Sequence, residues 1–282
     1  MFIAYERNEL GVYSDIRLWV EELPKVGRSS FCLEEAVERF SHMTSAGLAN
    51  ALDRLSRSGK ICSVWRGVYA LVLPEYGLSG SIPPVEYIDQ LMNYVGAEYY
   101  VGLLTAASFQ GASHQSPQVF QVVVNKQLRS KEVAGARLEF AFKKNMSACG
   151  IEQKAVKSGS INVSVPAVTA LDLVSYLSRA GGISSAATVL AELADFVDFR
   201  AIDASCLDHE PRASIQRLGF ILDRALGEAD LAQELFEKCE QTGIRFSRTV
   251  LASGRPGKML SFDSKWKVAV NYDLEVGAGV LS

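Results

Sequence analysis

The feature that most constrains the fold is the pattern of apolar residues over residues 14–73. Three segments with helical spacing of apolar residues are followed by two short segments typical of β-strands. The helical part has three apolar faces: Ile16, Trp19, Val20 and Leu23; Leu33, Ala36, Val37 and Phe40; and Leu48, Leu52 and Leu55. Steps of three and four residues place side chains on one side of an α-helix. We therefore predict helices at Asp15–Leu23 after a Ser14 cap, at Leu33–Phe40, and from Thr44 or Ser45 until Gly59 stops the third.

A hairpin follows these helices. Two short strands, Ile61–Val64 and Val68–Val72, are separated by Trp65-Arg66-Gly67, where glycine suits a tight turn. Helices followed by such a hairpin in about 60 residues match the plan of a winged helix-turn-helix, whose third helix enters the DNA major groove. The sequence therefore predicts an α+β protein with an N-terminal winged helix-turn-helix DNA-binding domain at residues 1–75.

Local charge supports this interpretation. The 282-residue chain has a net charge of −3, which excludes a uniformly basic nucleic-acid binder. Between Arg39 and Arg66, however, five basic residues face the single acid Asp53, a net of +4. A small basic head within a weakly acidic chain is expected to bind DNA phosphates.

Six residues are the candidate DNA contacts: Ser45, Asn50, Arg54, Arg57, Lys60 and Arg66. Asn50 can pair bidentately with adenine, and Ser45 can reach a base or a phosphate. The basic residues of the third helix and its end would contact phosphates, and Arg66 would contact backbone or minor groove from the turn. Winged helices also serve as protein–protein modules, so this alternative stays open.

Residues 76–282 are predicted to form a larger mixed α/β domain. After a link rich in proline and glycine, helices are expected at 85–94, 99–110, 167–179, 183–196, 206–223 and 230–241. Strands are expected at 118–125, 138–143, 151–156, 161–165 and 266–274.

Catalytic and metal sites find little support in this second domain. Its sequence has no nucleophile elbow, phosphate-binding loop or dinucleotide-binding glycine motif. We expect His114 to tie a loop, and Asp172, in an otherwise apolar helix, to cap or to pair with a base. Glu152-Gln-Lys154 fits half of a nuclease pattern, the least favoured alternative. We therefore expect no enzymatic activity, no cofactor and no metal.

The cysteines and the ends of the chain indicate the compartment. Five cysteines without a close pair favour scattered, reduced residues in a reducing cytoplasm. The start resembles no signal peptide, and no run of about 18 apolar residues suggests a membrane helix. We expect a cytoplasmic protein.

Charge is divided along the second domain. Residues 126–157 and 245–267 each have a net charge of +5, and residues 192–240 have a net charge of −7. Such segments could bind RNA, a toxin or a second copy of the chain, or could neutralise one another within the fold.

Several motifs, in order along the chain, resemble the AbiEi-type antitoxin family. They are Gly67-Val-Tyr69, Pro74-Glu-Tyr-Gly77, Tyr99-Tyr-Val-Gly-Leu-Leu-Thr-Ala-Ala107, Gly111-Ala-Ser-His-Gln-Ser-Pro117, Gln118-Val-Phe-Gln-Val-Val-Val124, Thr169-Ala-Leu-Asp-Leu173, Arg217-Leu-Gly-Phe220 and Trp266-Lys-Val-Ala-Val-Asn271.

The resemblance implies a bacterial antitoxin of a two-gene module linked to abortive infection. Its winged helix would bind inverted repeats in the module's own promoter, with dimerisation on DNA possible, and repress it. The family's contacts in the third helix and wing fall here on Ser45, Asn50, Arg54, Arg57 and Arg66. The C-terminal domain would counteract a nucleotidyltransferase-like toxin, by direct binding or only functionally.

Overall fold

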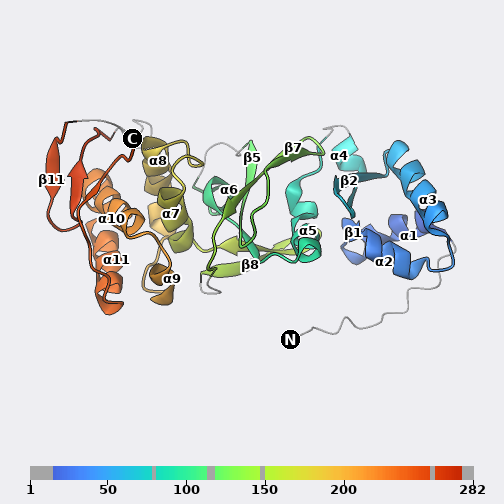
Figure 1. The fold of residues 1–282 in the computed structure, drawn as a ribbon, viewed down its shortest axis with the longest axis horizontal. Coiled ribbons are helices and arrows are strands. Elements are labelled where there is room, and N and C mark those ends of the chain that lie inside the picture. The colour runs from blue at the N-terminus through green and yellow to red at the C-terminus, as the bar shows by residue number, and fades with distance from the viewer. Residues whose placement is uncertain (1–14, 78–80, 113–117, 147–149, 255–257, 275–282) are drawn as a thin grey trace. The chain divides into compact units, whose positions relative to one another are not determined.

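The computed structural model describes residues 15–77, 81–112, 118–146, 150–254 and 258–274 (Figure 1). These residues form a mixed α/β protein with three sheets, in the strand orders β1-β3-β2, β6-β7-β5-β4-β9-β8 and β10-β12-β11. The chain divides into two compact units. Unit 1 holds the residues up to Gly96 together with residues 132–136 and 155–160, and unit 2 holds the rest.

Unit 1 begins with three helices around an aromatic core. They are α1 (Ile16–Glu22), α2 (Leu33–Arg39) and α3 (Ser45–Arg57), which confirms the three predicted helices. Trp19 packs edge-on against Phe31 and Phe40, with ring centroids 4.9 and 5.7 Å away. Asp15 caps α1, whereas the predicted cap, Ser14, lies outside the described residues.

The small sheet of unit 1 contains the predicted hairpin and one strand that the sequence did not reveal. The hairpin strands are β2 (Ile61–Trp65) and β3 (Val68–Leu71), and β1 (Ser30–Cys32) pairs antiparallel with β3. Three residues are too few to show an alternating pattern, so β1 was not predicted. Val37, expected in the core, is 51% exposed.

The remainder of unit 1 consists of short helices and two connecting segments, residues 132–136 and 155–160. It contains α4 (Pro74–Gly77), a 3-10 turn (Pro84–Glu86) and α5 (Ile88–Val95). Lys157 pairs with Glu75 at 3.1 Å, and the Ser158 hydroxyl donates to the Val85 carbonyl. The predicted domain division at residues 75 and 76 stays a prediction, because compactness does not show which part folds by itself.

The large sheet of unit 2 has both parallel and antiparallel pairs. Its strands are β4 (Tyr99–Val101), β5 (Val119–Val124), β6 (Lys131–Val133), β7 (Ala136–Phe142), β8 (Ile151–Val156) and β9 (Gly159–Ser164). β4 runs antiparallel to β5 and parallel to β9, and β5 runs parallel to β7. Val122, Val123 and Val124 of β5 are fully buried, as their unbroken apolar run predicts.

Helices complete unit 2. They are α6 (Leu103–Phe109), α7 (Pro166–Ser175), α8 (Ile183–Leu193) with a 3-10 turn (Ala194–Phe196), α9 (Ser205–Asp208), α10 (Arg212–Phe220) with a π-helical turn (Ile221–Leu226), and α11 (Ala229–Gln241). Their apolar faces surround a core that includes Leu171, Leu190, Leu218, Leu235 and Trp266.

Two predicted helices are wrong in part. Residues 99–101 are strand β4, because the Tyr-Tyr-Val run lies between β5 and β9. The expected helix over 206–223 is broken at Pro211, which cannot donate its backbone nitrogen and disfavours helical backbone just before it.

The predicted C-terminal strand is also wrong in part. The strand expected at 266–274 is shorter, β12 (Val268–Val270), and it lies between two strands that were not predicted, β10 (Thr249–Val250) and β11 (Ser261–Asp263). The Trp266 ring lies directly over Gly219 of α10, where an added Cβ would come within 2.2 Å of the ring. The ring can approach the helix this closely only because glycine has no side chain.

The structure can be compared with two expectations from the sequence, namely that the cysteines are reduced and that no helix crosses a membrane. Cys239 is a buried free thiol, and Cys32 and Cys62 are half-buried free thiols, but Cys206 is disulfide-bonded, contrary to expectation. Cys149 lies outside the described residues. Among the described helices none has both the length and the apolar character needed to cross a bilayer.

Candidate functional site

The third helix of unit 1 separates a buried face from a polar one. Thr44 caps α3 by accepting a hydrogen bond from the Gly47 backbone N–H at 3.1 Å, while Leu48, Leu52 and Leu55 are buried. Asn50, Arg54 and Arg57 are exposed. Their spacing of four and seven residues places them on one side of the helix, away from the leucines. We call Asn50, Arg54 and Arg57 the reading face.

Salt bridges occupy two of the six predicted contacts. Arg57 pairs with Asp53 at 2.9 Å, and both side chains are exposed. Lys60 lies 3.6 Å from Glu21 of α1. Such exposed pairs contribute only about 0–1 kcal/mol, so a phosphate can displace the acid at little cost.

Arg54 differs from its neighbours on the reading face. It makes no ion pair with any described residue and lines a groove of about 530 Å³ between α1 and α3, together with Asp15 and Lys60. Its guanidinium is therefore available for an anion without breaking an existing pair.

Ser45 lies apart from the reading face. It is the first residue of α3 and precedes Asn50 by five positions, which at about 100° per residue turns its side chain roughly 140° away from that of Asn50. The structure therefore does not bring Ser45 together with the other α3 candidates.

Arg66 lies on a turn that is held in place by contacts at the neighbouring Gly67. The hydroxyl of Tyr94 of α5 packs so closely on Gly67 that an added Cβ would come within 2.2 Å of it. The Leu33 N–H donates to the Gly67 carbonyl at 2.8 Å. Arg66 itself is exposed, so a fixed turn presents its side chain to solvent.

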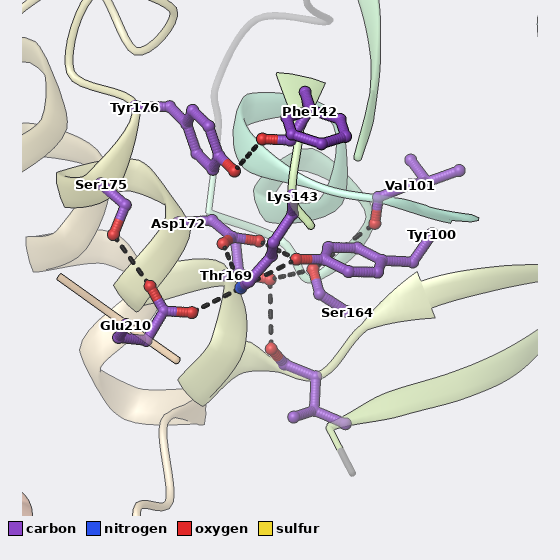
Figure 2. A network of polar contacts seen from close by, with 11 residues as sticks. Tyr100, Val101, Phe142, Lys143, Ser164, Thr169, Asp172, Ser175, Tyr176 and Glu210 are labelled. Carbon is purple, nitrogen blue, oxygen red and sulfur yellow. Dashed lines mark hydrogen bonds and ion pairs between the residues drawn. The ribbon is translucent and has the colours of Figure 1, made fainter. Parts of the chain in front are cut away.

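Unit 2 contains a buried charged cluster, which we define as Tyr100, Lys143, Asp172 and Glu210 (Figure 2). The Lys143 ammonium lies 3.1 Å from Asp172 Oδ1 and 2.5 Å from Glu210 Oε1. The Tyr100 hydroxyl donates to Asp172 Oδ2 at 2.7 Å. The cluster thus ties β4, the end of β7, α7 and the segment before α10.

The electrostatics of the cluster follow from two carboxylates that share one ammonium in a largely buried site. Burial opposes the charge on Lys143, but Asp172 and Glu210 outweigh it and hold the pKa of Lys143 above its ordinary value. Burial, assisted by the Glu210 charge, raises the pKa of Asp172 above its ordinary value despite Lys143. Burial also raises the pKa of Tyr100, and the neighbouring Asp172 carboxylate adds to the shift.

Further hydrogen bonds fix the cluster in place. Ser175 donates to Glu210 Oε2 at 3.0 Å, and Tyr176 donates to the Phe142 carbonyl at 2.8 Å (Figure 2). The adjoining cavity, lined by Lys143, His209 and Glu210 among others, measures about 20 Å³. This is roughly the space of one water molecule, so the arrangement suits a structural cross-link better than a substrate chamber.

The other predicted candidates are separate from this cluster, apart from Asp172. Asp172 pairs with a base, as expected for a carboxylate in an apolar helix. Glu152 and Lys154 are exposed on β8, and His114 lies outside the described residues. Within the described ranges there is no group of three or more histidine, cysteine, aspartate or glutamate residues that could hold a metal.

Comparison with known proteins bears on unit 2. Residues 100–224 match the family model described as the AbiEi antitoxin C-terminal domain. Residues 100–224 are therefore similar to this antitoxin domain. The match confirms the resemblance noted from the sequence and supports an antitoxin role with a toxin as partner. All four residues of the charged cluster lie inside the AbiEi domain, so the cluster is part of its framework.

The fold is similar to that of a protein whose structure has been solved. The crystal structure of the RV2827C protein from Mycobacterium tuberculosis is 14% identical, with a TM-score of 0.62 over 89% of each chain. At this identity the likeness concerns the fold alone. No curated protein matches the sequence.

Sequence reasoning missed three of the four cluster residues. Tyr100 and Asp172 are 72 positions apart, and Lys143 and Asp172 are 29 apart. The only local signal was the aspartate in an apolar helix, which requires a partner but does not identify it.

Proposed function

We propose that the chain is a DNA-binding antitoxin that represses its own operon and counteracts a nucleotidyltransferase-like toxin without catalysing a reaction. The AbiEi domain supports the antitoxin role. The proposal adds a winged helix-turn-helix in unit 1, inverted promoter repeats as the DNA target, and the cytoplasm as the compartment.

One observation carries the DNA-binding part of the proposal. Unit 1 follows the element order α1-β1-α2-α3-β2-β3 with the strand order β1-β3-β2. This arrangement is typical of winged helices, in which the helix before the hairpin lies in the major groove. That helix is α3, and its exposed side carries an amide and two guanidinium groups.

The roles of these groups follow from their chemistry. Asn50 would donate to and accept from an adenine edge, which reads sequence. Arg54 and Arg57 would contact phosphates, which sets affinity and register but not sequence. Arg66, on the turn held in place at Gly67, would contact the backbone or minor groove beside the helix.

The buried charged cluster supports a role without catalysis. Its charged groups are already paired with one another, and the adjacent cavity has room for about one water. The proposal therefore assigns the cluster to the stability of the AbiEi domain and leaves the toxin to be opposed by its surface.

An electrophoretic shift assay on the upstream promoter tests the proposal. Arg54→Ala with Arg57→Ala should weaken binding to all DNA and reduce the slope of log K against log salt by about two, since each lost phosphate contact removes about one. Arg129→Ala with Lys144→Ala, which removes two exposed charges from unit 2, should leave binding unchanged. Equal losses in both double variants would refute specific use of α3.

A further inference from the structure

The C-terminal sheet has an outer face on which apolar side chains are exposed. Val250 and Phe262 both pair with Ala269 of β12, so all three lie in one row across the sheet. Leu260, two residues before Phe262, follows on the same side. Val250, Leu260 and Phe262 are 41%, 62% and 44% exposed. The opposite face, with Val268, lies in the core of unit 2.

Arg248 adds a positive charge to this outer face. Its guanidinium carbon lies 5.5 Å from the centre of the Phe262 ring, and its Nη2 lies 3.1 Å from the sulfur of Met259, which is 50% exposed. Arg248 makes no ion pair with any described residue. We call Arg248, Val250, Met259, Leu260 and Phe262 the cationic sheet face.

The two edges of the sheet are unequal. Arg217 donates to the Val250 carbonyl at 2.9 Å and so covers the edge at β10. Among the described residues β11 pairs only with β12, which leaves its other edge open. Exposed apolar side chains beside an open edge favour contact with another protein surface, and Phe, Met and Arg are enriched in the centres of such contacts.

The same chain carries a surface of the matching chemistry. Phe196 is 53% exposed, and the exposed carboxylates Asp195 and Asp198 flank it in sequence. Asp195 makes no ion pair with any described residue. The acidic helix α11, by contrast, has no large exposed apolar side chain. We call Asp195, Phe196 and Asp198 the acidic knob.

We propose that the cationic sheet face binds the acidic knob of a second copy of this chain. Phe196 would pack on Leu260 and Phe262, with Asp195 beside Arg248. Because each copy carries both surfaces, two copies can exchange the contact reciprocally about a two-fold axis and close a dimer. A two-fold dimer would suit an inverted DNA repeat, but the contact itself involves no DNA and stands without the proposed repression.

Sedimentation equilibrium of the full-length chain without DNA tests the inference. The wild type should show a concentration-dependent monomer–dimer equilibrium. Phe262→Ser, Arg248→Glu and Asp195→Lys should each weaken the dimer at least tenfold, because each substitution acts at both contacts. Val37→Ser, which changes another exposed apolar residue, should not. Circular dichroism and the midpoint of thermal unfolding check that each variant folds.

Mixing two variants tests directly whether the contact is reciprocal. In an Arg248→Glu and Asp195→Lys pair, one contact joins Glu to Lys and the other keeps Arg248 with Asp195, so the mixture should dimerise like the wild type. A monomeric wild type, a dimer unaffected by these substitutions, or a mixture that stays monomeric would overturn the inference. So would a monomeric chain whose cationic sheet face instead binds the product of the neighbouring gene.

Discussion

At the scale of residues, the most constrained group is the Asp172 carboxyl, which is fully buried between a tyrosine hydroxyl and an ammonium. Lys143 balances only one of the two carboxylates that contact it. Burial, assisted by the negative charge of Glu210, makes Asp172 retain its proton at a higher pH than an aspartate in water.

This shift predicts a pH dependence of stability. Above the ordinary aspartate pKa of 3.8, the folded chain still holds a proton at Asp172 that the unfolded chain has lost, so this group's contribution to the free energy of unfolding falls as pH rises. Asp172→Asn removes this contribution. Relative to the wild type, the variant should therefore gain stability as pH rises from 3.8 to the raised pKa of Asp172 in the folded chain, by about 1.4 kcal/mol per pH unit at most.

Urea unfolding at a series of pH values measures this difference. Asp208→Asn is the control, because Asp208 is an exposed aspartate in the neighbouring α9. Its stability should follow the wild type at every pH. A constant difference between Asp172→Asn and the wild type would contradict the assigned protonation.

At the scale of elements, tertiary packing determines the structure of segments whose local sequence pattern is ambiguous. The Arg217–Phe220 and Trp266–Asn271 segments, both quoted for the family resemblance, meet in the structure. Gln216 donates to the Trp266 carbonyl at 2.7 Å, and the Trp266 indole donates to Asp223 at 3.0 Å. These bonds hold the ring against Gly219, so α10 and the turn before β12 fit together only if residue 219 has no side chain.

Gly219→Ala tests this fit. Alanine favours a helix by about 1 kcal/mol over glycine, but its Cβ would overlap the Trp266 ring. Overpacking costs roughly 1–3 kcal/mol in a tight core, and the helix preference offsets about 1 kcal/mol of it. We therefore expect a net loss of up to about 2 kcal/mol in the free energy of unfolding. Chemical denaturation measures it. Gly77→Ala, where nothing lies within 4 Å, should be close to neutral, and equal stabilities of the two variants would disprove the close contact.

The elements also show what sequence can predict. Long periodic segments such as α3 and α11, and the buried run of β5, were predicted to within a few residues because each carries its own pattern. β1, β6 and β10 have two or three residues each and owe their strand form to their partners. The Tyr99–Val101 strand was read as helix because its pairing with β5 and β9 is not visible locally.

The candidate site divides in the same way. The reading face of α3 could be predicted because Asn50, Arg54 and Arg57 share one helix with the buried leucines that orient it. The charged cluster could not, because three separate segments deliver Tyr100, Lys143 and Glu210 to Asp172. The salt bridge from Lys60 to Glu21 likewise depends on how α1 packs.

At the scale of the whole molecule, we propose that repression and toxin neutralisation belong to different parts of the chain. The reading face lies in unit 1, and the AbiEi domain begins at residue 100. The full-length Arg54→Ala and Arg57→Ala double variant should therefore release a promoter–reporter fusion while still protecting cells that express the neighbouring toxin gene. Loss of protection at an unchanged protein level would show that the two roles cannot be separated.

The proposal that α3 reads the sequence of the chain's own promoter is tested by fluorescence anisotropy with duplex DNA. The wild type should prefer the promoter repeat to a scrambled duplex at the same salt concentration. Asn50→Ala should reduce this preference by a factor of roughly 5–150, the worth of one bidentate base contact of about 1–3 kcal/mol, while binding to the scrambled duplex stays unchanged. Equal wild-type affinity for both duplexes, or an undiminished preference in Asn50→Ala, would contradict it.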